Sequence, residues 1–299
     1  MQILLLTPYP QAWPKGLSVP AKQSTPVLHL LPNPFPLPSP DPLPPNPYET
    51  TNYPTLSAAI QPILAEHPQV VAFGEIHPEV GFTHRSTKSY FTEEVLPALA
   101  SEGIKDLVLE QILTDPAIEA EIEKFYSSGC EINAEDTPQL WQYTNYSDRQ
   151  DLYRMLHKCR ELGIRVRAGG MTIAQAEETV RAFDYTANQG LKLKALIYNG
   201  QATRAGIDSL LQQDPERRLA VFGGLIHNNL NDGSDDGTNF GEYLAERFGQ
   251  GYIEVDLLSP QNESAMDNFG QVSNWRELIP LNGVNLLDRG QTLIILFPQ

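Results

Sequence analysis

Two short apolar runs, each broken by glycine and followed by a histidine, constrain the fold of this 299-residue chain most strongly. The first, VVAFGEIH, ends at His77, and the second, LAVFGGLIH, ends at His227. Gly74 and Gly224 each stand three residues before the histidine, and Gly74 is expected to let the backbone turn as its strand ends. Apolar runs of this length indicate buried strands, the kind found in parallel sheets.

Strand and helix patterns alternate along most of the chain. This alternation predicts an α/β fold, with a mostly parallel central sheet covered by helices on both faces. Residues 55–299 are predicted to form a single domain. Apolar runs predict strands at 69–75, 105–112, 164–170, 218–224, 252–258 and 291–297. Helical periodicity predicts helices at 55–67, 85–102, 116–128, 148–162, 172–187 and 240–248, while 192–200 fits either a strand or a helix end.

Proline dominates the N-terminal region, residues 1–54. Fourteen of the 25 prolines fall within the first 50 residues, and proline excludes helix interiors and central strands. An extended or disordered extension is therefore expected, and the alternative is a docking segment for an aromatic groove. A second irregular region, near 130–150, is aromatic and is interpreted as a lid or an insertion.

The net charge excludes some classes of partner, and the cysteines bear on disulfide content. A net charge of −16 argues against nucleic acid and against anionic membrane surfaces, because both require a basic face. Cys130 and Cys159 do not form a disulfide framework, and Cys159 fits a buried helix position. With no run of 18 apolar residues and no recognisable leader, a cytoplasmic location is expected.

Four acid and base side chains fall at predicted strand ends. They are Glu75 and His77 after the first run, Glu110 after LVLE, and His227 after the second run. Open α/β sheets place ligands at the carboxyl ends of their strands, so these side chains predict a catalytic or metal site. Two imidazoles and two carboxylates suit Zn, Mn, Co or Fe, and without a metal the same groups can serve as general base and electrostatic support.

Simpler interpretations compete with this one. Polar residues often follow apolar strands merely because the strand reaches solvent, although three such ends with a repeated G-x-x-H pattern favour a shared site. His84 and Arg85 stand at the start of the next predicted helix, where they could bind an anionic group of a substrate or form a solvated loop pair.

The short motifs resemble those of the superfamily that contains the TIKI and TraB proteins, the ChaN-type haem-binding proteins and the erythromycin esterases. GEIH at 74–77, LVLEQ with Glu110, and FGGLIHN with Gly224 and His227 carry the resemblance, which covers roughly residues 60–260. It implies a hydrolase of a peptide, ester or lactone, with Asn228 among the substrate contacts and a divalent metal as cofactor. The alternative that it implies is a ChaN-like protein that binds haem or a related tetrapyrrole without catalysis.

Overall fold

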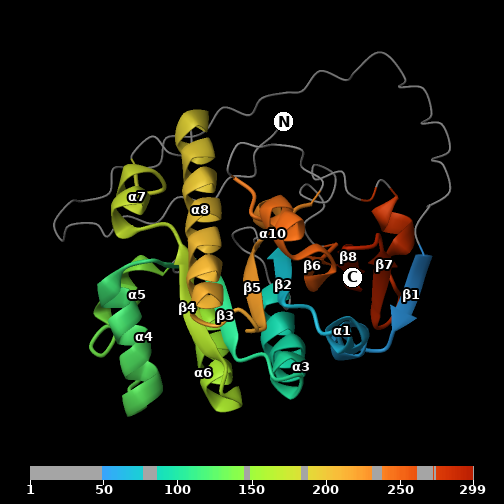
Figure 1. Cartoon of the computed structure of the whole chain (residues 1–299), viewed down its shortest axis with the longest axis horizontal. Coiled ribbons are helices and arrows are strands. Elements are labelled where there is room, and N and C mark those ends of the chain that lie inside the picture. Colours follow the sequence, from blue (N-terminus) through green and yellow to red (C-terminus); the bar gives the residue numbers. More distant parts are fainter. Residues whose placement is uncertain are drawn as a thin grey trace, which may run out of the picture.

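The computed structural model describes residues 49–76, 86–144, 149–182, 188–230, 238–260, 272 and 274–298. Within them, one eight-stranded sheet has the order β1-β7-β8-β6-β2-β5-β3-β4. The strands from β8 to β4 in this order run parallel, whereas β1 and β7 pair antiparallel at one edge (Figure 1). The strands are β1 (Glu49–Tyr53), β2 (Val70–Glu75), β3 (Asp106–Leu113), β4 (Arg165–Gly170), β5 (Leu219–Gly224), β6 (Tyr252–Leu258), β7 (Val284–Asp288) and β8 (Thr292–Leu296).

Helices cover both faces of this sheet, as the sequence predicts. The helices are α1 (Leu56–Ala65), α2 (Thr87–Tyr90), the π-helical η1 (Phe91–Val95), α3 (Leu96–Ser101), α4 (Pro116–Ser128), α5 (Pro138–Tyr143), α6 (Arg149–Leu162), α7 (Ile173–Glu178), α8 (Gln189–Gln213), α9 (Leu225–Asn228), α10 (Gly241–Phe248) and the 3-10 turns η2 (Gly249–Gly251) and η3 (Trp275–Leu278). No described helix has both the length and the apolar content needed to cross a bilayer.

The alternation of side chains along β2 shows how the two faces are filled. Val71 and Phe73 belong to the apolar cluster that includes α1, α3 and α6, whereas Val70 and Ala72 belong to the cluster that includes α8 and α10. Successive residues of a strand point to opposite faces, so a strand buried on both faces must be apolar throughout. This arrangement confirms the predicted α/β class.

Several elements differ from the sequence prediction in their limits. β1 lies inside the range 1–54 and pairs with β7, with Glu49 opposite Asp288. Residues 192–200 belong to α8, a 25-residue helix that begins at the N-cap Asn188 and packs on β4 and β3. The helix expected at 172–187 ends at Glu178, and residues 183–187 lie outside the described part. The irregular region near 130–150 contains α5, a six-residue helix.

Candidate functional site

A buried pair formed by Glu110 and His227 is the most developed polar arrangement at the carboxyl edge of the sheet. His227 Nε2 lies 3.2 Å from Glu110 Oε1, and both side chains are more than nine-tenths buried. The other ring nitrogen, Nδ1, hydrogen bonds to the Thr238 carbonyl at 2.6 Å. Glu110 Oε1 also accepts from Asn199 Nδ2 at 3.0 Å, and Oε2 accepts from the Gly224 amide at 2.6 Å.

These contacts fix the protonation of the pair. The Thr238 carbonyl can only accept, so Nδ1 of His227 carries a proton. The amide donors on Glu110 favour its carboxylate form. Burial by itself lowers the pKa of His227, but the charge and hydrogen bond of Glu110, together with the Thr238 carbonyl, raise that pKa above its ordinary value. The pair is therefore an imidazolium held against a carboxylate.

The double glycine of β5 makes the approach of these two side chains possible. Leu109 of β3 lies opposite Phe222 of β5, so Glu110 lies beside Gly223. A Cβ atom added at Gly223 would lie 2.3 Å from Glu110 Oε2, which is well inside van der Waals contact. Glu110 thus crosses β5 where β5 has no side chain, and the single turn of α9 places His227 at the end of that path.

Glu75 leaves the sheet on the opposite face. It follows the side-chain alternation of Phe73, whereas Glu110 follows that of Val108, which packs in the cluster with α8. Gln111, the neighbour of Glu110, shares the face of Glu75 and donates to its Oε1 at 2.8 Å. The sheet therefore separates the two predicted acids, although β2 and β3 are separated only by β5.

A lysine and a threonine complete the surroundings of Glu75. Thr87 donates to Oε2 at 2.8 Å, and Lys88 Nζ lies 3.5 Å from Oε1 with both side chains almost fully buried. Both residues belong to the first turn of α2, which the Ser86 side chain caps. The π-helical segment η1 follows directly, and such segments frequently occur near functional sites.

The other predicted site residues have different outcomes. His77, His84 and Arg85 lie outside the described residues. Asn228 is buried, and its side-chain amide donates to Asp256 Oδ1 at 3.3 Å. Among residues that the sequence analysis missed, Asn199 gave no local signal because it stands in the middle of a helix.

The described residues do not group into a metal site. No three histidine, cysteine, aspartate or glutamate side chains of the described part lie close enough together to hold a metal ion. The carboxylate oxygens of Glu110 and Glu75 already accept hydrogen bonds, and Lys88 places a positive charge beside Glu75. Among the described residues, this donor set fits ion pairs better than a cation.

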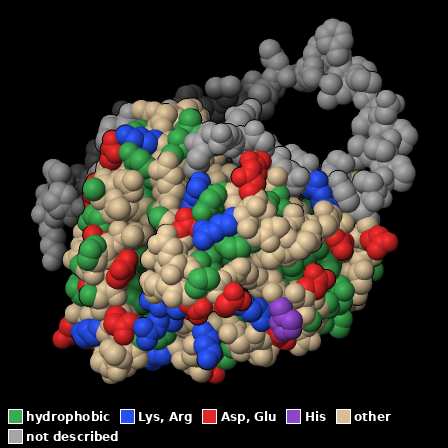
Figure 2. All heavy atoms as spheres, in the orientation of Figure 1, with side chains coloured by type: hydrophobic (Ala, Val, Ile, Leu, Met, Phe, Trp, Pro, Cys, Tyr) green, Lys and Arg blue, Asp and Glu red, His purple; other side chains and the backbone are tan. Residues whose placement is uncertain are grey.

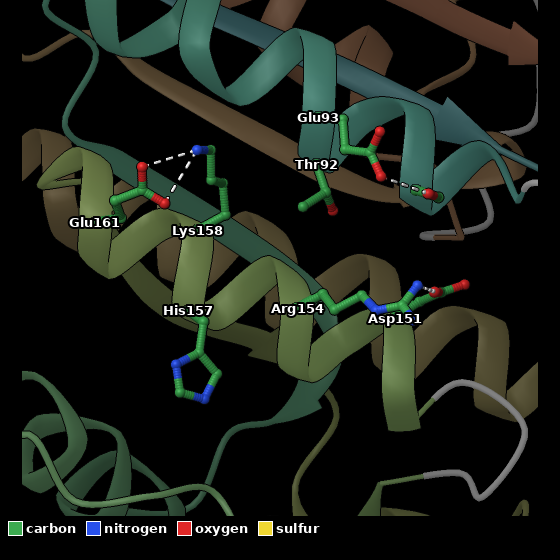
Figure 3. Close-up of a pocket in the computed structure, with 8 residues that line it drawn as sticks. Thr92, Glu93, Asp151, Arg154, His157, Lys158 and Glu161 are labelled. Carbon is green, nitrogen blue, oxygen red and sulfur yellow. Dashed lines mark hydrogen bonds and ion pairs between the residues drawn. The ribbon is translucent and has the colours of Figure 1, made fainter.

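A separate pocket lies between the helix that starts at α2 and helix α6 (Figure 3). Four of its charged side chains form ion pairs within the pocket, Lys158 with Glu161 at 2.9 Å and Arg154 with Asp151 at 3.7 Å, and Glu93 accepts from the Ser89 hydroxyl. Internal pairing leaves little charge for a ligand, so this pocket is a weaker candidate than the strand ends. It is lined by Ser89, Thr92, Glu93, Asp151, Arg154, His157, Lys158 and Glu161.

The surface seen in Figure 2 mixes acidic and basic side chains, and this face shows no continuous basic patch.

Comparisons with known proteins identify no family. No family model and no curated protein matches the chain. Similar solved structures include the type III effector HopBA1, at 13% identity and a TM-score of 0.48, over 83% of this chain and 97% of that one. ChaN of Campylobacter jejuni, described for cofacial heme binding, is 12% identical with a TM-score of 0.44, over 66% and 85%. RRSP, a MARTX toxin effector domain from Vibrio vulnificus, is 18% identical with a TM-score of 0.35, over 55% and 29%. At these values the likenesses carry no argument about function.

Proposed function

We propose that the chain is a hydrolase of a peptide, ester or lactone bond, and that Glu110 and His227 supply its acid. The observation that supports this most is the buried imidazolium–carboxylate pair at the carboxyl edge of a parallel sheet, where α/β enzymes place their chemistry. A buried group with a shifted pKa beside a specific charged partner is typical of functional sites.

In the proposed reaction, the described residues hold and deliver one proton. The Thr238 carbonyl and Glu110 fix both nitrogens of the His227 ring, so its orientation is set before substrate binds. The imidazolium gives the Nε2 proton to the leaving group when that group replaces Glu110 as the acceptor of this N–H, and Glu110 stabilises the charged ring until that step. Asn199 is a positioning residue because it holds Glu110.

The second part of the proposal, the base that activates the attacking water, rests on the sequence. His77, two residues after Glu75, is assigned as the base that takes a proton from the attacking water. Glu75 is kept as a carboxylate by Thr87, Gln111 and Lys88. No step is assigned to a metal ion, because the described oxygen atoms of both acids are engaged by hydrogen-bond donors.

A panel of fluorogenic peptides, esters and lactones tests this proposal. His227→Gln should lower kcat by roughly 10²–10⁴-fold, the usual contribution of a proton-transfer group. His157→Gln is the matched control, because His157 lies on the partly exposed face of α6, far from the strand ends in sequence, and its polar partners are Glu131 at 3.6 Å and Arg160 at 3.4 Å. Equal activity of both variants would contradict the proposal.

Haem binding without catalysis predicts a different result. Haemin added to the purified protein would then give a stoichiometric Soret shift, while the substrate panel would show no turnover. Metal analysis of the same preparation separates a metal-dependent hydrolase from the metal-free reaction, since a bound metal lost in Glu110→Gln would assign that carboxylate as a ligand.

A further inference from the structure

Two fully buried acids lie side by side on β6, beneath the helix that carries His227. Glu254 and Asp256 are both completely inaccessible to solvent, and their two-residue spacing places them on the same face. Like charges so close together in the interior cannot both be ionised without large cost. The structure must therefore neutralise one of them.

The hydrogen bonds of the two acids leave room for one proton between them. Glu254 Oε2 accepts from the Thr292 hydroxyl at 2.7 Å and from the Leu230 amide at 3.1 Å. Asp256 Oδ1 accepts from the Asn228 amide. Glu254 Oε1 is buried and receives no N–H or O–H donor from the described residues, so the carboxyl of Asp256, two residues away on the same face, is the group placed to share a hydrogen with it. Two carboxyl groups can bond in this way only when one of them carries a proton.

Burial keeps a proton within the pair. Burial raises the pKa of Glu254 to about 7, although the donors Thr292 and Leu230 and the charge of Arg289 lower it. One proton is therefore retained by the pair in the pH range where an exposed carboxyl would already have lost it.

This acid pair also anchors the segment around His227. Asn228 and Leu230, which follow His227 directly, each donate to one of the two acids. Gly74 leaves the space that they need: a Cβ atom there would lie 2.6 Å from Asp256 Oδ1. We propose that Glu254 and Asp256 share one proton as a carboxylic acid–carboxylate pair, and that this pair positions α9 so that His227 meets Glu110. The inference deepens the proposed function and rests on it only for the chemical role of His227.

Amide substitutions test the shared proton. In Asp256→Asn the new N–H₂ supplies the hydrogen to Glu254, and in Glu254→Gln it supplies one to Asp256, so each single variant should keep a urea midpoint near that of the native protein. In the double variant two N–H₂ groups face each other, and the loss should exceed the sum of the single losses. Two ionised carboxylates would instead make each single substitution costly or stabilising by itself, and that result would overturn the shared proton.

The pH dependence of stability gives a second readout. The folded pKa of the pair is raised, so its contribution is fully present below about pH 4, the ordinary carboxyl range, and is lost as the pH rises through the folded value. Asp256→Asn should flatten this slope, and Thr292→Val, a mild change, should move it to higher pH. Around the pair, α9, β2 and β8 contribute the uncharged Asn228, Gly74 and Thr292. Tyr252 is a titratable neighbour that stays neutral over this range, because its pKa is raised well above its usual value, and Arg289 is a charged neighbour of Glu254.

The ring signals of His227 test the positioning role without any substrate. In nitrogen-15 NMR spectra of the whole chain, Asp256→Leu should lower the His227 pKa, because α9 shifts and the imidazolium loses Glu110, while Asp256→Asn should restore the native value. Val255→Ala is the matched control, since Val255 is buried on the other face of the same strand. If Asp256→Leu does not fold, Thr292→Val carries the test. An unchanged pH slope in Thr292→Val, or an unchanged His227 pKa in folded Asp256→Leu, would overturn the inference. Lost activity with unchanged His227 signals would count against the proposed function alone.

Discussion

Replacing Glu110 by glutamine should destabilise the protein in a way that depends on pH. Glutamine keeps the shape of the side chain but changes one oxygen atom into an N–H₂ group. Oε1 accepts from Asn199 and faces His227, and Oε2 accepts from Gly224. In either orientation of the amide, a donor therefore faces a donor. A buried donor left unsatisfied costs about 1–3 kcal/mol, and breaking a buried ion pair costs about 3–5 kcal/mol.

The sign of the pH effect follows from His227. Its folded pKa is raised, so the stability that it contributes is fully present below about pH 6.5, the unfolded value, and is lost as the pH rises through the folded pKa. Glu110→Gln removes the charge that raises this pKa. We expect a loss of about 3 kcal/mol near pH 6, falling toward the cost of one unsatisfied donor, about 1 kcal/mol, at higher pH.

Urea unfolding of both proteins at several pH values between about 6 and 9 measures this difference. Glu161→Gln provides the control, because Glu161 is exposed and its ion pair with Lys158 lies on a helix surface, where such pairs contribute little. A loss that is the same at every pH would refute the imidazolium–carboxylate assignment. A loss well below 1 kcal/mol would refute the burial of the pair.

Three further changes test other contacts of the site. Gly223→Ala should displace Glu110 and lower the free energy of unfolding by about 1–3 kcal/mol, measured by urea titration, because the added Cβ overlaps the carboxylate. Lys88→Met should cost about 3–5 kcal/mol by leaving Glu75 without its buried cation, and the double variant with Glu75→Gln should recover part of the loss in a double-mutant cycle. Cys159 should not react with a thiol reagent until the protein unfolds, because burial raises the pKa of its thiol far above the usual range.

Each of these changes has a control within the chain. Gly251→Ala should be nearly neutral, since its Cβ would meet only ordinary contacts at 3.6 and 3.8 Å. Lys158→Met removes a partly exposed lysine and should cost little. Cys130 is only partly buried and should react in the native protein. Full reactivity of both cysteines in the native state, or equal losses in the paired glycine or lysine variants, would contradict the assigned contacts.

Sequence patterns predicted the parallel core of the fold because buried strands on both faces leave a strong signal. β2, β3, β5 and β6 all fall within one or two residues of their predicted ranges. The antiparallel edge formed by β1 and β7 was not predicted, because β1 is mostly exposed and its apolar content is low. α9 was also missed, since a single helical turn is too short for periodicity.

The expectation that ligands bind at the carboxyl ends of strands pointed to Glu110 and His227, which the structure places in contact. The same expectation could not show on which face of the sheet Glu75 lies. Whether two acids on neighbouring strands share a face of the sheet depends on the register in which the strands pair. A shift of that register by one residue moves a side chain to the opposite face. Here β2 and β3 both pair with β5, and that register puts Glu75 with Gln111 on one face and Glu110 on the other. The sequence motif gives the residue types at these positions but not the register between the strands.

Gly74 has a role different from the expected turn at the strand end, and Gly223 of the second motif shares this role. Gly74 and Gly223 lie inside their strands rather than at turns, and neither has a positive φ. Each is required where a polar side chain crosses the sheet: Asp256 over Gly74, and Glu110 over Gly223. A side chain at either position would displace a buried acid from its hydrogen bonds. The glycines of the two motifs therefore leave space for polar networks, in addition to the acids and histidines that the motifs contain. The glycines and the acids therefore have to be substituted together for either network to be rebuilt in another form.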